Sequence, residues 1–159
     1  MIYVFDIDGT IANNEHRGHL LPSSDLHLTS SWKDYNKACS GDSPIIPMIN
    51  MMNTLAELST VYIMTSRSDE VERMTLEWLQ YNDIEYDSIY MRSRHDNRKD
   101  YKIKEEWLNE ISDGDKSNVV IFEDNPQVIK HLRSCGYTVM AVCEYEELPK
   151  DCESHGGGK

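Results

Sequence analysis

One stretch at the start of this chain is the strongest indication of its fold: Ile2-Tyr3-Val4-Phe5-Asp6-Ile7-Asp8-Gly9-Thr10. Its apolar and β-branched start predicts a strand buried on both faces, because only such a strand tolerates an unbroken apolar run. Gly9 then allows the sharp exit that a positive φ provides. The strand therefore carries Asp6 and Asp8 to the carboxyl edge of a parallel sheet, where open α/β sheets bind ligands.

Two aspartates separated by one residue suit the chemistry of phosphate esters. One carboxylate can attack an electrophile and form a covalent intermediate, while the other exchanges a proton with the leaving oxygen. Two anions this close also favour a divalent cation between them, and Mg²⁺ prefers hard oxygen ligands. Asp8-Gly9 is equally a common turn pair, so Asp6 and Asp8 by themselves are also consistent with the plain end of a strand.

Further apolar runs follow along the chain at regular intervals. Buried strands are predicted at residues 61–64, 88–91, 119–122 and 137–142, and amphipathic helices separate them. This alternation predicts an α/β fold: a Rossmann-like, three-layer parallel sheet with helices on both faces and right-handed crossovers. We expect one domain over residues 1–150, followed by a flexible tail at 151–159.

Residues 13–47 predict a small cap or lid inserted after the first strand. The stretch from Asn13 to Thr29 is polar and irregular, and long loops of this kind tend to cover binding sites. A helix is expected next, capped by Ser30 or Ser31. Pro47 is expected to be the first residue of the following helix. That helix should bury a stripe formed by Met48, Met51, Met52, Leu55 and Leu58.

Composition limits the classes of partner. The formal net charge is −12, which disfavours a protein that grips long stretches of phosphate backbone and favours a small nucleotide or a strand end. Six of the 16 basic residues fall between Arg92 and Lys104, and they predict an anion-attracting patch. The four cysteines show neither a Cys-x-x-Cys pair nor zinc-ligand spacing, and the six histidines are scattered along the chain, so a histidine metal site is not expected. No apolar run is long enough to span a membrane, and a cytoplasmic protein is expected.

Three more predicted strand ends or helix starts carry polar side chains. Thr65-Ser66-Arg67 follows one strand, Glu123-Asp124 follows another, and Lys104 lies near the start of a helix. These groups supply a hydroxyl, a cation and metal-ligating carboxylates, which are the parts of an in-line phosphoryl transfer. Simpler interpretations remain open, because a serine here can cap the next helix and Lys104 can be an exposed helix residue.

Together these residues resemble the four motifs of the haloacid dehalogenase (HAD) superfamily of phosphatases. A narrower resemblance, to the 3′-phosphatase domain of phage polynucleotide kinase-phosphatase, covers residues 2–142. It depends on Arg17 and on Thr65-Ser66-Arg67, where that family tends to have Ser-Gly-Arg. Three further segments also match: Arg73-Met74-Thr75, Arg98-Lys99-Asp100 and Lys104-Glu105-Glu106. No Gly-x-x-x-x-Gly-Lys-Ser/Thr loop occurs, so no kinase domain is expected in this chain.

The resemblance implies a role for each matching residue. Asp6 would be the nucleophile and a Mg²⁺ ligand, and Asp8 would be the acid/base and bind the metal through its carbonyl. Thr65 and Lys104 would hold the phosphoryl oxygens, and Asp124 would ligate Mg²⁺ with Glu123 beside it. Asp100 would orient Lys104 or an arginine. The implied substrate-binding residues are Thr10, Arg17, Ser66, Arg67 and Asp100.

The function expected from these residues is that of a Mg²⁺-dependent phosphomonoesterase. It would act through an aspartyl-phosphate on a nucleotide or on the 3′-phosphate end of a nucleic acid, in the host cytosol if a phage encodes it. A 5′-nucleotidase that acts on free nucleoside monophosphates is the alternative within enzymes. A HAD-like module that binds a nucleotide or a protein without catalysis is the alternative outside enzymes.

Overall fold

The predicted parallel sheet is present in the computed structural model, which describes residues 1–142. Five parallel strands lie in the order β5-β4-β1-β6-β7. Cys143, Cys152 and the predicted tail lie outside the described residues. The strands are β1 (Ile2–Phe5), β4 (Thr60–Ser68), β5 (Ser88–Arg92), β6 (Val119–Glu123) and β7 (Thr138–Ala141).

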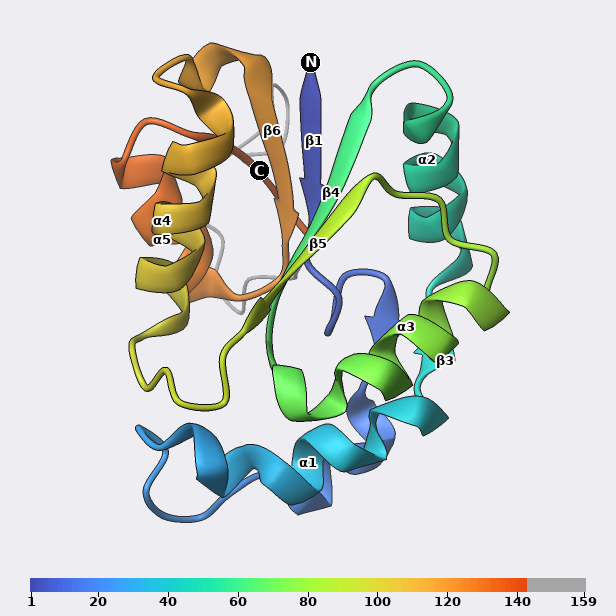
Figure 1. Cartoon of the computed structure of the whole chain (residues 1–159), viewed down its shortest axis with the longest axis vertical. Helices are drawn as coiled ribbons and strands as arrows, with labels where there is room; N and C mark the ends of the chain where they lie inside the picture. Colours follow the sequence, from blue (N-terminus) through green and yellow to red (C-terminus); the bar gives the residue numbers. More distant parts are fainter. Residues whose placement is uncertain (143–159) are drawn as a thin grey trace, which may run out of the picture.

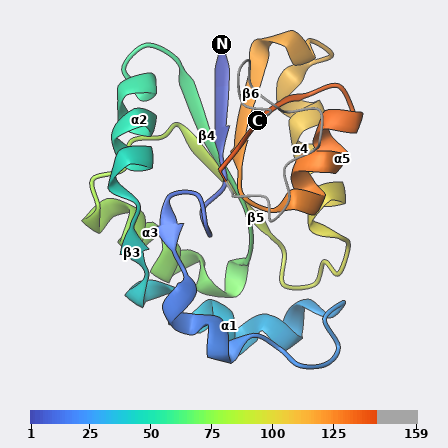
Figure 2. The same ribbon diagram turned by 180° about the vertical axis from the view of Figure 1, so that it is seen from behind.

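Helices cover both faces of this sheet, which confirms the three-layer architecture (Figures 1 and 2). Phe5 of β1 packs in the core on the side of α2 and α3, whereas its neighbour Val4 packs in the core on the side of α4 and α5. A strand buried on both faces explains why the first run is apolar throughout. The helices are α2 (Ile46–Ala56), α3 (Glu72–Tyr81), α4 (Asp100–Ser112) and α5 (Pro126–Ser134).

A pair of very short strands closes the insertion after β1. β2 (Ala12–Asn13) pairs antiparallel with β3 (Ser43–Pro44). The chain between them lies across the carboxyl ends of the central strands (Figure 1). It contains α1 (Lys33–Lys37) and three 3₁₀ helices at Glu15–Leu20, Thr29–Trp32 and Ala38–Gly41. Two further 3₁₀ helices, Asp69–Val71 and Lys116–Asn118, precede α3 and β6.

Several predicted boundaries are wrong by a few residues. The stretch from Asn13 to Thr29 contains a 3₁₀ helix, and α1 is a short helix that neither Ser30 nor Ser31 caps through its side chain. Pro47 is the second residue of α2, and Leu58 is 89% exposed because the helix has already ended at Ala56. β4 continues beyond residue 64 to Ser68, whose hydroxyl accepts a hydrogen bond from the amide of Glu70.

Within residues 1–142, none of the helices combines the length and the apolarity that a membrane crossing requires.

Candidate active site

Three acidic side chains meet at the carboxyl ends of β1 and β6. Asp6, Glu123 and Asp124 each place a carboxylate oxygen within 4.8 Å of the other two. Lys104 of α4 lies between them, because its Nζ donates to Asp6 Oδ1 at 2.8 Å and to Glu123 Oε2 at 2.6 Å. The packing of α4 against the sheet thus joins Asp6 and Lys104, which are 98 positions apart in the sequence.

Burial and neighbouring charges change the pKa values of the groups in this cluster. Burial, and then the charge of Glu123, raises the pKa of Asp6 well above its ordinary value. The same two causes raise the pKa of Asp124 to about 7. Burial by itself would lower the pKa of Lys104, but the carboxylates of Asp6 and Glu123 outweigh it and raise that pKa. Three carboxylates share one ammonium group, so the cluster has an excess of negative charge that a cation would neutralise.

Gly9 is required where the chain leaves β1. Its φ is +80°, in the left-handed region that favours glycine. A Cβ at this position would lie 2.0 Å from Oδ2 of Asp124 and 2.5 Å from its Cγ. Only glycine therefore allows the Asp124 carboxylate to lie directly over the backbone beside Asp6 and Asp8.

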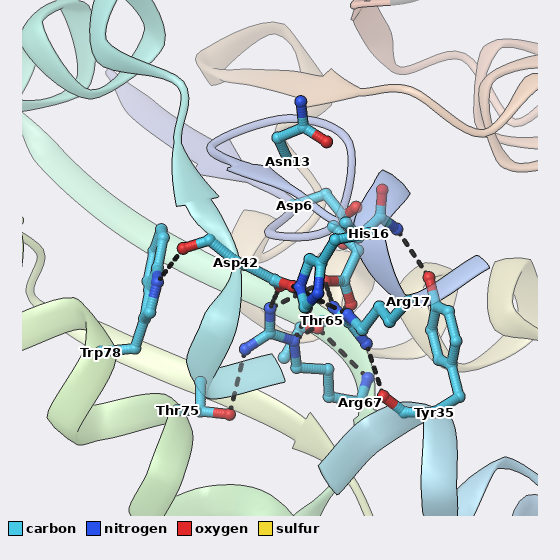
Figure 3. Close-up of polar contacts among 12 residues, drawn as sticks. Asp6, Asn13, His16, Arg17, Tyr35, Asp42, Thr65, Arg67, Thr75 and Trp78 are labelled. Atoms are coloured by element: carbon cyan, nitrogen blue, oxygen red, sulfur yellow. Dashed lines mark hydrogen bonds and ion pairs between the residues drawn. The ribbon is translucent and has the colours of Figure 1, made fainter. Parts of the chain in front are cut away.

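Two buried arginines, Arg17 and Arg67 (labelled in Figure 3), hold Asp8 on the other side of the site. Arg67 Nη2 donates to Asp8 Oδ1 at 2.7 Å, and Arg17 Nη2 contacts the same oxygen. Burial by itself would raise the pKa of Asp8, but the guanidinium groups of Arg67 and Arg17 outweigh it and lower the pKa. Asp8 is therefore ionised in this arrangement, and its carboxylate contacts Arg17 of the insertion and Arg67 of β4.

Asp42 is a central residue of this site that the sequence did not indicate. Its carboxylate is fully buried and accepts from Arg17 Nε at 2.9 Å and from Arg67 Nη2 at 2.9 Å. His16 lies 2.7 Å from it, and the backbone carbonyl of Asp42 accepts from Trp78 Nε1 at 2.8 Å. In the sequence, Gly41-Asp42-Ser43-Pro44 looks like an ordinary turn, so no local signal distinguishes this aspartate.

Tyr35 of α1 also contacts Arg17 without having been singled out for this role. Its backbone carbonyl accepts from Arg17 Nη1 at 3.1 Å, and the guanidinium carbon lies 4.3 Å from the centre of the tyrosine ring. This contact to the ring is of the cation–π type, which adds to the fixation of a buried arginine. The insertion therefore supplies Arg17 together with the groups that fix it.

The remaining predicted site residues fall in different places. Thr65 is buried, and its Oγ1 accepts from the amide of Arg67 at 3.2 Å, whereas Ser66 lines the cavity described below. Thr10 is fully buried and does not line that cavity. Among the described residues, its Oγ1 is the buried side-chain oxygen that lacks a hydrogen-bond partner. Asp100 accepts from Arg92 Nη2 at 2.5 Å, so it contacts an arginine and not Lys104.

The basic segment predicted to attract anions is largely neutralised by neighbouring acids. Arg94 pairs with Asp69, Lys102 pairs with Glu105, and Arg98 pairs with two acids. The segment therefore carries less free positive charge than its basic residues suggest. The carboxylates come from Asp69 on the 3₁₀ helix before α3, from Asp96 within the segment, and from Glu105 and Glu106 of α4. Attraction of anions to this segment stays a prediction. Lys99 forms no ion pair with the described residues and lies on the wall of the cavity.

A cavity of about 530 Å³ opens above both clusters. Its floor includes Asp6, Asp8 and Lys104, and the insertion and the basic segment form its walls. The wall residues include Leu26, His27, Trp32, Tyr35, Asn97, Arg98, Lys99 and Asp100. Carboxylates, arginines and a lysine therefore face one solvent-accessible space that could contain a phosphate ester.

Known proteins resemble this chain in both sequence and fold. Residues 1–146 match the family of the polynucleotide kinase PNKP phosphatase domain. A protein of Autographa californica nuclear polyhedrosis virus, named as a bifunctional polynucleotide kinase/RNA ligase, is 28% identical over 142 residues. The match covers 87% of this chain and 19% of the viral protein, so the chain spans only a small part of that relative.

Solved structures show the same fold. One chain of the Pnkp1/Rnl/Hen1 complex superposes with a TM-score of 0.70 at 21% identity, over 92% of this chain and 46% of that chain. A haloacid dehalogenase-like hydrolase from Streptococcus pneumoniae gives a TM-score of 0.64 at 17% identity, over 88% of this chain and 83% of that chain. These likenesses confirm the predicted HAD-like sheet.

Proposed function

Because this chain belongs to the family of polynucleotide kinase PNKP phosphatase domains and is a phosphatase of the HAD type, we propose that it removes the 3′-phosphate from a nucleic-acid end in a Mg²⁺-dependent reaction. The observation that carries this proposal is the position of Asp6. Its carboxylate lies at the floor of the cavity, where it accepts from Lys104 and lies beside Glu123 and Asp124. The acid/base candidate Asp8 lines the same cavity.

Asp6 acts as the nucleophile in this proposal. One oxygen of its carboxylate forms a bond to phosphorus, and the bond between phosphorus and the 3′-oxygen of the substrate breaks. Lys104 is already within hydrogen-bond distance of Asp6, so its ammonium group can neutralise charge as the phosphoryl oxygens approach. The product of this step is a phosphoryl group attached to Asp6.

Asp8 moves the protons of both half-reactions. As an acid it gives a proton to the leaving 3′-oxygen, and as a base it then takes one from the water that attacks the phosphoryl group. Arg67 and Arg17 lower the pKa of Asp8 in the free protein, which opposes the acid form. We infer that the substrate phosphate draws these arginines partly away from Asp8, because a phosphate dianion competes for the same donors.

The donor set fits a magnesium ion. Asp6, Glu123 and Asp124 offer carboxylate oxygens, the ligands that Mg²⁺ prefers, and Asp8 offers its backbone carbonyl. Burial, and then the charge of Glu123, raises the pKa values of Asp6 and Asp124, and a cation beside these carboxylates would favour their charged forms. When bound, Mg²⁺ would supply charge neutralisation for the phosphoryl oxygens.

A nucleic-acid end as the substrate is supported by the cavity and by the relatives. Trp32 and Tyr35 line the wall formed by the insertion, and aromatic rings of this kind can stack on bases. Lys99 also lines the cavity, and it forms no ion pair with the described residues, so a neighbouring phosphate could lie beside it. The family name and the viral relative's name both refer to polynucleotides.

A phosphate-release panel tests the proposal. The chain is incubated with Mg²⁺ and with 3′- and 5′-mononucleotides, or with DNA and RNA oligonucleotides that carry a 3′-phosphate. We expect the highest kcat/KM on an oligonucleotide, and complete loss of release in a chelator that is reversed by added Mg²⁺. Equal kcat/KM on 5′-mononucleotides would overturn the polynucleotide assignment in favour of a nucleotidase. Phosphate release that is indifferent to the chelator would overturn the metal assignment.

A further inference from the structure

A second cluster of side chains lies on the helices α4 and α5, outside the cavity. Glu105 of α4 faces His131 of α5, and Cys135 follows one turn after that histidine. One carboxylate oxygen, one imidazole nitrogen and the thiol sulfur all lie within 4.8 Å of one another. None of the three residues lines the cavity, and the reaction proposed above uses none of them.

The distances among these atoms fit a tetrahedral metal site. The sulfur of Cys135 lies 3.5 Å from His131 Nε2 and 3.5 Å from Glu105 Oε1. Zinc bonds of about 2.3 Å to sulfur and about 2.0 Å to nitrogen or oxygen, at tetrahedral angles, imply edges of about 3.5 Å to the sulfur. His131 Nε2 lies 2.8 Å from the other oxygen of that carboxylate, Oε2, so the carboxylate would turn to present one oxygen to an ion.

We propose that Glu105, His131 and Cys135 bind a Zn²⁺ ion, with water as the fourth ligand. A thiolate, an imidazole and a carboxylate are the three protein ligands that zinc takes, whereas Mg²⁺ avoids sulfur. The thiol of Cys135 now donates to Glu105 Oε1, and its proton leaves to solvent when the sulfur binds the metal. His131 would bind through an unprotonated Nε2, with its one ring proton on Nδ1. This site is independent of the carboxylate cluster, which offers oxygen ligands alone.

The surroundings of the cluster favour a preformed site. The ring of Tyr101 lies against that of His131, with 4.5 Å between the ring centres, which limits rotation of the imidazole. The side chains of Glu105 and His131 are 26% and 22% exposed, so an ion can reach them. Lys102 pairs with Glu105 at 3.3 Å, and its side chain is 55% exposed, so it can leave toward solvent when the metal enters.

Such an ion would connect α4 to α5. Helix α4 contains both Glu105 and the neighbouring Lys104, which contacts Asp6 and Glu123. A metal bridge between the two helices would stabilise the folded chain, because an ion that binds the folded state alone raises its stability with concentration. The proposal therefore predicts a Tm that rises with added Zn²⁺ even when Mg²⁺ already saturates the carboxylate cluster.

Cobalt provides a direct test of the thiolate ligand. The whole chain, reduced and in excess Mg²⁺, is titrated with Co²⁺, and thiolate-to-cobalt charge-transfer absorption is recorded in the near ultraviolet. We expect this absorption in the unchanged chain and in the control variants Cys143→Ser and Cys152→Ser, and its loss in Cys135→Ser. Added Zn²⁺ should displace the cobalt. Absorption that persists in Cys135→Ser, or its absence from the unchanged chain, would overturn the proposal.

Calorimetry with Zn²⁺ tests the other two ligands. We expect His131→Gln and Glu105→Gln each to weaken Zn²⁺ binding by at least about tenfold. Removal of a residue that only hydrogen-bonds to a metal ligand already lowers metal affinity by about tenfold or more. The Tm of each variant in chelator reports folding separately from metal binding. Zinc affinity that is unchanged in both variants, with an unchanged Tm, would contradict the site. Mg²⁺-dependent phosphate release by Cys135→Ser should stay within about twofold of the unchanged chain.

Discussion

The two halves of the candidate active site balance their charges in opposite ways. On the carboxylate side, Asp6, Glu123 and Asp124 share one ammonium group, that of Lys104. On the arginine side, two carboxylates face two guanidinium groups, and every one of them is paired: Asp8, Asp42, Arg17 and Arg67. The first half therefore lacks positive charge, whereas the second is neutral by itself.

This difference indicates what each half does. A cluster with excess negative charge destabilises the free chain and is suited to bind a cation, which relieves the repulsion. A buried and fully paired network instead fixes the geometry of its members, and removal of one partner leaves an uncompensated charge. Loss of a carboxylate should consequently have opposite effects on stability in the two halves.

The largest effect is expected from Asp6→Asn. Loss of the nucleophile should lower kcat for phosphate release by about 10⁴-fold or more, a scale typical of nucleophile removal. In chelator, the same variant should have a higher Tm than the unchanged chain, because one charge leaves a cluster in which burial and Glu123 raise the pKa of Asp6. Thermal unfolding and phosphate release are the two measurements. Full activity, or a lower Tm in chelator, would contradict the contrast between the halves.

Asp8→Asn should have the next largest effect. An amide cannot give a proton to the leaving oxygen or take one from water, so kcat should fall by about 10² to 10⁴-fold. A substrate with a good leaving group, such as an aryl phosphate, needs less help with the first proton transfer and should be affected less. A loss of the same size on both substrates would place Asp8 in the second half-reaction or outside proton transfer.

Asp42→Asn should mainly affect stability. The carboxylate of Asp42 is fully buried between Arg17 and Arg67, so its loss leaves buried positive charge. We expect a decrease of about 3 kcal/mol in the free energy of unfolding, measured by denaturant titration. Glu77→Gln, which removes an exposed acid paired with Arg73, is the matched control and should leave Tm unchanged. Equal effects of the two variants would show that the arginine network contributes no more than a surface pair.

Lys99→Ala should have the smallest effect. Lys99 lines the cavity wall and forms no ion pair with the described residues, so it is available to a second phosphate of an oligonucleotide. We expect KM for a 3′-phosphorylated oligonucleotide to rise a few-fold with kcat unchanged, and KM for a mononucleotide to stay the same. Arg73→Ala, far from the cavity lining and exposed, is the control. A change in kcat on both substrates would assign Lys99 to the reaction itself.

Local patterns were sufficient to predict the fold. The apolar runs of residues 2–5, 61–64 and 119–122 predicted strands that the structure confirms, because a strand buried on both faces must be apolar along its length. Boundaries were less predictable. The length of β4 and the short turns of the insertion depend on contacts between distant segments, such as the pairing of Ala12 with Pro44.

The sequence by itself determined which groups reach the carboxyl edge of the sheet. Asp6, Glu123 and Asp124 follow apolar runs directly, so their meeting follows from the parallel topology, while their catalytic roles stay predictions. Only the tertiary structure decided how those groups are paired. Asp42 lies in an ordinary turn sequence, and Asp69, the acid that neutralises Arg94, lies 25 positions away in the sequence. Hydrophobic periodicity is a local property of the chain, whereas the partner of a charge is decided by which segments the folded chain brings together.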